Sequence, residues 1–200
     1  MTTGANQDFS TKGGYDQVTG WGSPIADALT TALLGGGSSG GTTPPPTGGC
    51  TAAQLIGNGG FETGTAAPWT TSSGVVDNSS SEPAHSGSWK AWLDGYGSAH
   101  TDTLSQTVSV PAGCASATLT FALHIDTAET GSTPYDKLTL KAGSTTLKTW
   151  SNADAAAGYV QQTLDLTSFA GQTVTLTFTG TEDGSNQTSF LIDDVALNVK

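Results

Sequence analysis

The sequence predicts an all-β protein whose larger part folds as a two-sheet antiparallel β-sandwich of the jelly-roll type. Three observations favour this class. Apolar and polar residues alternate with a period of two in several stretches of the second half of the chain. The segments between these stretches are rich in Gly, Pro, Asn and Asp, which are turn residues. Threonine, whose branched side chain suits a pleated surface, accounts for 34 of the 200 residues.

The first part of the chain is predicted to hold a short helix followed by a linker. Ser23 is a suitable N-cap and Pro24 fits the first helical position. The next stretch reads GGGSSGGTTPPPTGG and has no apolar side chain to bury, so we expect it to be flexible. The chain therefore divides into a helical segment 1–34, a linker 35–49 and a β-sandwich 50–200.

Seven stretches of the larger part carry strand signals, and a two-sheet jelly roll is expected to have about eight strands. In most of these stretches, apolar residues recur at every second position and so face one side of a sheet. A fibronectin-like sandwich with fewer strands is the alternative. In chain order the predicted strands lie within residues 88–93, 104–110, 117–125, 138–140, 164–166, 174–178 and 188–199.

The last predicted strand contains a change of parity. Phe190 and Ile192 occupy even positions, whereas the apolar residues from Val195 onward occupy odd ones, so the inward face switches between Asp193 and Asp194. Such a switch requires an extra residue, a β-bulge. Two adjacent carboxylates repel each other unless a cation or hydrogen-bond donors compensate them, so we expect a bound cation here. An exposed acidic turn is the alternative.

The charge of the chain excludes two classes of partner. It has 17 acidic and 6 basic residues, which gives a formal net charge of -11, and none of the basic residues is Arg. Because phosphate binding needs clustered cations, we expect neither a nucleic acid nor an anionic membrane surface as a partner. The sequence also has no window of about 18 apolar residues that could span a bilayer.

Cys50 and Cys114 are the two cysteines of the chain. An even number of cysteines in an acidic, hydroxyl-rich protein of extracellular type predicts one disulfide. A pair of reduced, buried thiols is the alternative. The first residues have neither the basic nor the apolar part of a signal peptide, so we interpret the chain as a secreted protein whose N-terminal residues continue an upstream domain.

Residues 13–24, which read GGYDQVTGWGSP, resemble the closing stretch of the sedolisin and kumamolisin family of secreted serine-carboxyl peptidases. The resemblance covers residues 1–34 and implies an upstream peptidase domain as a partner. It also implies that Asp16 is a ligand of a structural calcium ion. The catalytic Ser, Glu and Asp residues of that family all precede this motif. We therefore expect that this chain is not an enzyme and that its full-length parent is a serine-carboxyl endopeptidase.

Three short segments of the larger part are similar to the marker segments of jelly-roll carbohydrate-binding modules, which have a galactose-binding-like fold. They read NGGFE at 58–62, SGSWK at 86–90 and FLIDDV at 190–195. Such modules also occur as accessory domains at the C-termini of secreted bacterial hydrolases. The resemblance implies a structural calcium ion held by Glu62 and Asp193 together with backbone carbonyls near the middle segment. Lys90 and Asp194, which lie in the same segments, are included as candidate ligands.

Exposed aromatic rings are the usual platforms for sugars, because the C–H face of a pyranose stacks on a π-system. The first candidates for ligand binding are Trp69, Trp92, Tyr96 and Trp150, and Tyr135 and Tyr159 are further aromatic candidates. Trp89 and Trp92 have opposite parity within one predicted strand, so both cannot face the core. One ring of this pair is therefore expected to be exposed, and Tyr96 follows on the adjoining turn.

The loop from residue 94 to residue 102 contains Asp94, Tyr96, His100 and Asp102. It is a candidate for a patch that binds sugar hydroxyls or a second cation, and a solvated polar turn is the favoured alternative. The three histidines of the chain have no metal-ligand spacing and no Ser or Cys partner in a motif. No hydrolytic triad is predicted.

We therefore predict that the chain is the non-catalytic C-terminal accessory part of a secreted bacterial sedolisin-like peptidase, stabilised by calcium. Its expected ligand is a polysaccharide or the protein substrate of the parent enzyme, and we expect a monomer. Two alternatives remain open. One is a stand-alone carbohydrate-binding module, and the other is a purely structural appendage that binds no ligand.

Overall fold

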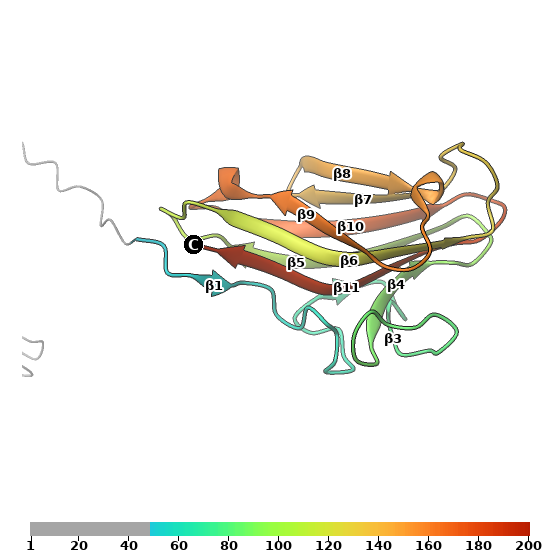
Figure 1. Ribbon diagram of the computed structural model, residues 1–200, viewed down its shortest axis with the longest axis horizontal. Helices are drawn as coiled ribbons and strands as arrows, with labels where there is room; N and C mark the ends of the chain where they lie inside the picture. Colours follow the sequence, from blue (N-terminus) through green and yellow to red (C-terminus); the bar gives the residue numbers. More distant parts are fainter. Residues whose placement is uncertain (1–48) are drawn as a thin grey trace, which may run out of the picture. The chain divides into compact units, whose positions relative to one another are not determined.

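Two antiparallel β-sheets face each other in the computed structural model, which describes residues 49–200 (Figure 1). One sheet has the strand order β3-β4-β11-β6-β9, with β1 paired to β11, and the other has the order β2-β5-β10-β7-β8. The strands are β1 (Ala53–Gln54), β2 (Thr70–Thr71), β3 (Val76–Asp77), β4 (Lys90–Asp94), β5 (His100–Ser109), β6 (Ala117–Thr127), β7 (Lys137–Ala142), β8 (Thr145–Ser151), β9 (Val160–Asp165), β10 (Thr173–Glu182) and β11 (Thr188–Val199). Two short 3-10 helices are η1 (Asn152–Asp154) and η2 (Thr167–Phe169). The prediction of an all-β sandwich with two antiparallel sheets is confirmed.

Eight of the strands have five or more residues, which agrees with the expected number. Strand β8 carried no signal in the sequence, because it is an edge strand and most of its side chains are exposed. The three two-residue strands are too short to show a period. Within residues 49–200, no helix is long and apolar enough to cross a membrane. The predicted N-terminal helix, the linker and Asp16 lie outside the described residues.

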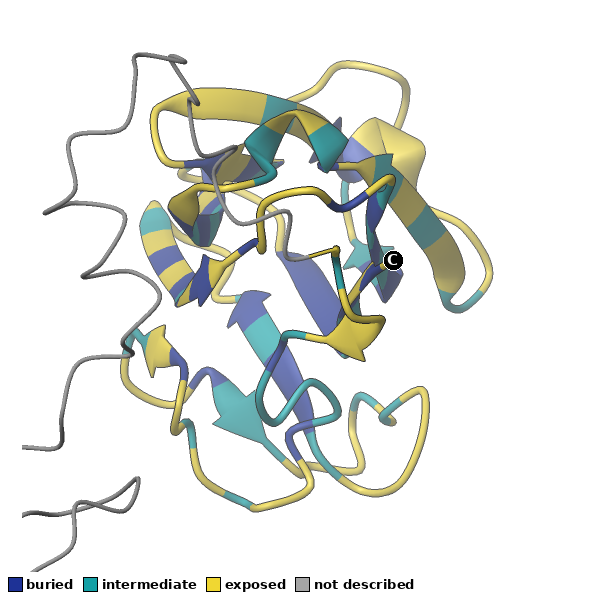
Figure 2. Cartoon of the chain, turned by 90° about the vertical axis from the view of Figure 1, so that its left-hand side faces the viewer, coloured by how far each residue is buried: buried dark blue, intermediate teal, exposed yellow. Residues whose placement is uncertain are grey.

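The core lies between the sheets and consists of the alternating apolar residues that the sequence indicates. Phe121 of β6 is fully buried and packs edge-to-face on Phe178 of β10, with ring centroids 5.1 Å apart. It also packs on Trp150 of β8, with centroids 5.6 Å apart. Figure 2 shows the alternation as bands of buried and exposed residues along single strands. Each large apolar side chain removed from water stabilises the fold by about 2 kcal/mol.

Strand β11 organises its sheet, since it pairs with β1, β4 and β6. Its register with β6 shifts between Asp193 and Ala196, where Asp194 and Val195 together lie opposite the single residue Phe121. Asp194 adopts a left-handed φ of 50°. The predicted bulge is therefore confirmed, and apolar residues on both sides of it face the core.

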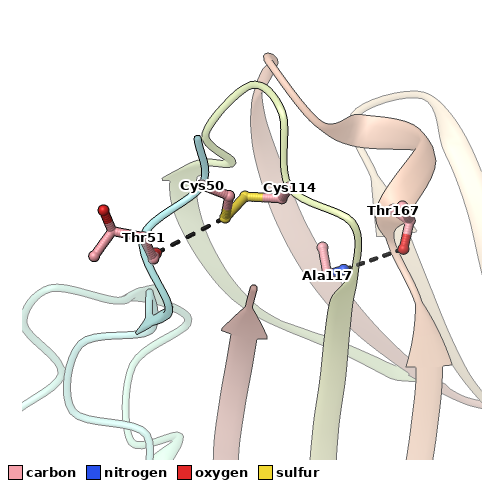
Figure 3. Close-up of a disulfide and its surroundings, with 5 residues drawn as sticks. All are labelled: Cys50, Thr51, Cys114, Ala117 and Thr167. Atoms are coloured by element: carbon pink, nitrogen blue, oxygen red, sulfur yellow. Dashed lines mark hydrogen bonds between the residues drawn. A yellow bond between two sulfur atoms is a disulfide. The ribbon is translucent and has the colours of Figure 1, made fainter. Parts of the chain in front are cut away.

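Cys50 and Cys114 form a disulfide with their Cα atoms 4.6 Å apart, which confirms the predicted pair (Figure 3). The bond joins the segment before β1 to the loop between β5 and β6, across a sequence separation of 64. Nearby, Ser116 and Lys200 exchange two backbone hydrogen bonds of 2.9 and 3.1 Å. Both ends of the sandwich domain are therefore fastened at the β5–β6 loop.

Replacing Cys50 and Cys114 by Ser should lower the free energy of unfolding by about 4 kcal/mol, because the open chain gains loop entropy when it unfolds. Urea unfolding followed by Trp fluorescence measures this difference, and the reduced and oxidised forms of the native chain are the control pair. An unchanged unfolding midpoint in the double variant would show that the disulfide does not stabilise the sandwich.

Candidate functional site

Glu62 and Asp193, the two predicted calcium ligands, both hold the loop between β3 and β4. Oε1 of Glu62 accepts hydrogen bonds from the backbone amides of Ser88 at 2.9 Å and Trp89 at 2.8 Å. Oδ2 of Asp193 accepts one from the amide of Ser86 at 3.0 Å. The loop is therefore fixed between one carboxylate near the start of the domain and one in its last strand.

Two carboxylates lie beside Gly60, together with the aliphatic part of the Glu62 side chain. A Cβ atom placed on this glycine would be 3.5 Å from Oδ1 of Asp194, 3.9 Å from Oδ1 of Asp193 and 3.9 Å from Cγ of Glu62. Asp193 is fully buried, and this burial raises the pKa of its carboxyl, although the amides of Ser86 and Asp194 act in the opposite direction. The three marker segments of the sequence thus meet at one point.

The side chains that could bind a cation here offer carboxylate oxygens, which are suitable ligands for calcium. Asp194 binds Nδ1 of His85 at 2.6 Å and the hydroxyl of Ser86 at 2.7 Å. The ammonium group of Lys90, another residue predicted at this site, forms an ion pair with Oδ1 of Asp77 at 2.7 Å. In the described part of the chain, no three His, Cys, Asp or Glu side chains converge closely enough to hold a metal ion. A calcium ion beside Glu62 would therefore need backbone oxygens and water as additional ligands.

A cavity of about 340 Å³ opens between the edge strands β8 and β9 of the two sheets. Leu123 and Ile125 of β6 contribute apolar lining, together with Trp150 of β8. Lys148 of β8 and Gln162 of β9 add polar groups. Polar groups make up somewhat more of the accessible lining than apolar groups do, and the volume lies at the lower end of the range of small-ligand sites.

The polar groups of the cavity are organised by Gln162. Its Oε1 accepts hydrogen bonds from Nε1 of Trp150 at 3.0 Å and from Nζ of Lys148 at 3.2 Å. The ammonium of Lys148 also lies 4.9 Å from the centroid of the Trp150 ring. Asp154 of η1 lines the cavity as well and is held by the amide of Ser151 at 2.8 Å. The cavity therefore offers an amide, a cation and a carboxylate beside an apolar surface.

Tyr96 and Tyr135 are the exposed rings among the aromatic candidates for ligand binding, and Tyr96 has 56% of its surface accessible. Its ring centroid lies 3.9 Å from that of His100. Trp69 and Trp150 are each 4% exposed, so the expectation of an open stacking platform is wrong for both. Burial wins because each indole packs in the core and still finds an acceptor for its N–H, the carbonyl of Asn58 for Trp69 and Gln162 for Trp150.

The remaining tryptophan candidate, Trp92, is half-buried on the face of β4 that points away from the core. Trp89 packs against the core instead, as opposite parity requires. The ammonium of Lys90 lies 5.3 Å from the Trp92 ring centroid. The exposed ring expected from this pair is therefore absent, and ligand binding by Trp92 stays a prediction.

Four carboxylates are buried where the β4–β5, β6–β7 and β10–β11 loops meet, at the right-hand end of Figure 1. We call this region the acidic end. It consists of Asp94, Asp102, Asp136 and Glu182. Glu182 accepts hydrogen bonds from the amides of Tyr96 and Gly97 at 2.9 and 2.8 Å. A solvated turn is therefore wrong for Asp94 and Asp102, which are 5% and 2% exposed.

Sequence reasoning did not single out Lys148, Asp154 or Gln162. A signal existed at Gln162, because this polar residue occupies the same face of β9 as Leu164, two positions away. Its partner Trp150 lies on a different sheet, and nothing in the spacing of the sequence indicates that pairing. The cavity is a product of how the two edge strands meet.

The fold resembles that of solved proteins, whereas no family model and no curated relative matches the chain. The carbohydrate-binding module TmCBM61, solved in complex with β-1,4-galactotriose, has a TM-score of 0.54 at 22% sequence identity. The match covers 74% of this chain and 99% of that module. The likeness shows that the chain shares the β-sandwich fold of TmCBM61.

Two other solved structures are similar over the same region. The K3 cleaved adhesin domain of Lys-gingipain from Porphyromonas gingivalis has a TM-score of 0.49 at 18% identity and covers 72% of this chain and 98% of its own. A cyclase from Fischerella sp. has a TM-score of 0.46 at 18% identity, with coverages of 74% and 97%.

Burial, together with the charges of Asp102, Glu182 and Asp136, raises the pKa of Asp94 from 3.8 to about 8. The folded chain therefore keeps a proton that the unfolded chain releases near pH 4. The stability that this proton contributes is complete below about pH 4 and is lost as the pH rises toward 8.

The variant Asp94→Asn should remove this loss, because an amide stays neutral. We expect its advantage in unfolding free energy over the native chain to grow between about pH 4 and about pH 8. Urea unfolding at several pH values in a buffer with EDTA measures the two profiles. Profiles that run parallel across this range would contradict the raised pKa.

Proposed function

We propose that the sandwich is a non-catalytic glycan-binding domain and that a sugar residue binds in the cavity between β8 and β9. The cavity itself carries this proposal, since several polar groups converge in it beside a smaller apolar surface. The shared fold with TmCBM61, whose structure holds β-1,4-galactotriose, supports it by analogy and suggests β-galactan as a first ligand to test.

The chemistry of the lining suits a pyranose. The C–H face of the sugar would contact Val160, which is 46% exposed and lines the cavity, and the small accessible parts of Leu123 and Ile125. The amides of Gln161 and Gln162, the carboxylate of Asp154 and the ammonium of Lys148 would bind hydroxyl groups. Because Gln162 is already held by Trp150 and Lys148, little side-chain entropy is lost on binding.

A structural role for calcium is the second part of the proposal. We assign the ion to the carboxylate oxygens of Glu62, Asp193 and Asp194 in the region of Gly60, where none of the three has a lysine partner among residues 49–200 and Asp194 has a histidine partner, His85. Glu62 precedes β2 and Asp193 lies in the last strand, so an ion shared by them would join the two ends of the domain. The ion would stabilise the fold by binding its native state alone.

The parent protein is the third part. We propose that the domain belongs to a secreted sedolisin-like serine-carboxyl peptidase and keeps that enzyme near a polysaccharide or a protein substrate. The motif at residues 13–24 supports this parentage. The disulfide between Cys50 and Cys114 agrees with secretion into an oxidising compartment.

Filling the cavity should abolish glycan binding without unfolding the domain. Ala156 is exposed and lines the cavity, so Ala156→Trp places a large ring at its mouth. We expect the affinity for soluble β-1,4-galactan to fall by about tenfold or more, which corresponds to about 1.4 kcal/mol. Affinity electrophoresis with galactan in the gel measures the change, and casein is the comparison ligand for a protein-docking role.

The matched control is Ala153→Trp, which adds the same ring to an exposed position of η1 that does not line the cavity. This variant should bind as the native chain does. If galactan retards both variants equally in the gel, the glycan does not bind in the cavity. Galactan binding that is undetectable in the native chain would favour the structural appendage or another ligand.

Removing calcium should lower the melting temperature of the domain, because the native state then loses the free energy of binding the ion and the adjacent carboxylates of Asp193 and Asp194 repel each other. The same decrease is expected from Glu62→Gln in the presence of calcium, and EDTA should then change this variant less than it changes the native chain. Differential scanning calorimetry measures both effects. A native melting temperature that EDTA leaves unchanged would rule out the ion.

A further inference from the structure

The acidic end contains one carboxyl group that has no hydrogen-bond partner. Asp94 is 5% exposed, and neither of its carboxylate oxygens has a hydrogen-bond partner among the residues that the structure describes. Burying an ionised carboxylate without partners is costly, because it loses its hydration and gains nothing in return. The position therefore calls for a group that the chain itself does not supply.

The other three carboxylates of the acidic end have donors. Glu182 binds the amides of Tyr96, Gly97 and Thr188. Asp136 binds the amide of Asp183 at 2.8 Å and the hydroxyl of Thr188.

Asp102 is held more loosely. Its Oδ2 accepts a hydrogen bond from the amide of Asp94 at 3.1 Å, and its Oδ1 lies 3.3 Å from Nε2 of His100. The ion pairs within residues 49–200 place no lysine on any of the four carboxylates. Negative charge is therefore concentrated here without a permanent cation.

The backbone makes room for the Asp94 carboxylate. Asp94 adopts a left-handed φ of 61°, which is uncommon for a residue other than Gly and directs its side chain toward β10. There it meets Gly180, where a Cβ atom would collide with Oδ2 of Asp94. The side chain of any other residue at position 180 would therefore collide with the Asp94 carboxylate. Strand β10 is otherwise rich in Thr, and Gly180 provides the space that this carboxylate occupies.

We propose that the acidic end is a second cation site, in which a hard divalent cation such as calcium binds the carboxylates of Asp94 and Asp102. The ion would have two carboxylate ligands only, since no three acidic or histidine side chains converge closely enough to hold a metal ion in the described part of the chain. Backbone oxygens and water would complete the ligand set, as they do in weak extracellular calcium sites. Glu182 and Asp136 keep their amide partners and add negative potential.

The proposed ion would also organise the exposed loop above it. Asp94 begins the β4–β5 turn and Asp102 lies in the strand that follows, so an ion between them closes this loop on itself. Tyr96 stands on the same loop and is already fastened through its amide to Glu182. Binding of the cation would therefore fix the position of the exposed Tyr96 ring. This site is independent of the Glu62 site and of the glycan cavity.

The experiment separates the two cation sites by working in the Glu62→Gln background. Calcium is titrated by isothermal calorimetry and by its effect on melting temperature. We expect that the Glu62→Gln variant still binds one calcium ion and that its melting temperature rises when calcium is added. Adding Asp94→Asn should abolish both responses and, in EDTA, should raise the melting temperature above that of Glu62→Gln. Asp165→Asn is the charge-matched control. Asp165 is exposed and lies in β9 opposite Thr118, at the end of β6 that is far from the acidic end.

Terbium luminescence gives a second readout that does not depend on the Glu62 variant folding. Tb³⁺ bound beside Asp94 would be sensitised by Tyr96, so Asp94→Asn in the otherwise native chain should lose part of the emission. Asp165→Asn should retain all of it. If Asp94→Asn changes neither the calcium stoichiometry nor the terbium emission, the proposal is overturned. Galactan binding is measured separately, so its failure would leave this result intact.

Discussion

The β-bulge in β11 is the constraint on which the rest of the sandwich depends. At the bulge the chain gains one residue, so apolar side chains can face the core on both sides while Asp193 turns toward the β3–β4 loop. The amide of Val195 then binds the carbonyl of Gly59 at 3.0 Å. Through these contacts β11 binds both the segment around Gly59, near the start of the domain, and the loop between β3 and β4. A straight strand in this place would point its second half outward.

Acidic residues are accommodated in two physically different ways. At the bulge, amides and a hydroxyl point at Asp193 and Asp194, so each charge is compensated locally by donors. At the acidic end, Asp136 and Glu182 are compensated in the same manner, but Asp94 is buried with no partner in the described chain. With 6 lysines against 17 acidic residues, the protein has few cations of its own to place beside such a group. Amide donors and bound ions are the remaining means of holding buried carboxylates.

Local patterns predicted much of the architecture and part of the candidate site. The alternation around Phe121 and Phe178, the parity switch at Asp193 and the cysteine pair each follow from rules that involve neighbours in sequence or simple counting. The convergence of Glu62 and Asp193 was implied by a resemblance and agrees with their shared loop. The exposure of tryptophans was not predictable in this way, because an indole is equally compatible with a core and with a binding surface.

The sequence by itself determined the all-β class, the positions of the long strands other than β8, the bulge and the disulfide, because periodicity and residue chemistry act over a few neighbouring positions. Only the tertiary structure decided where the edge strands β8 and β9 meet and hence the cavity that joins Trp150 to Gln162. It also decided that Asp94 is buried over Gly180, 86 positions away in sequence. Both outcomes depend on pairings between distant segments, which are set by the packing of two whole sheets and leave no local pattern.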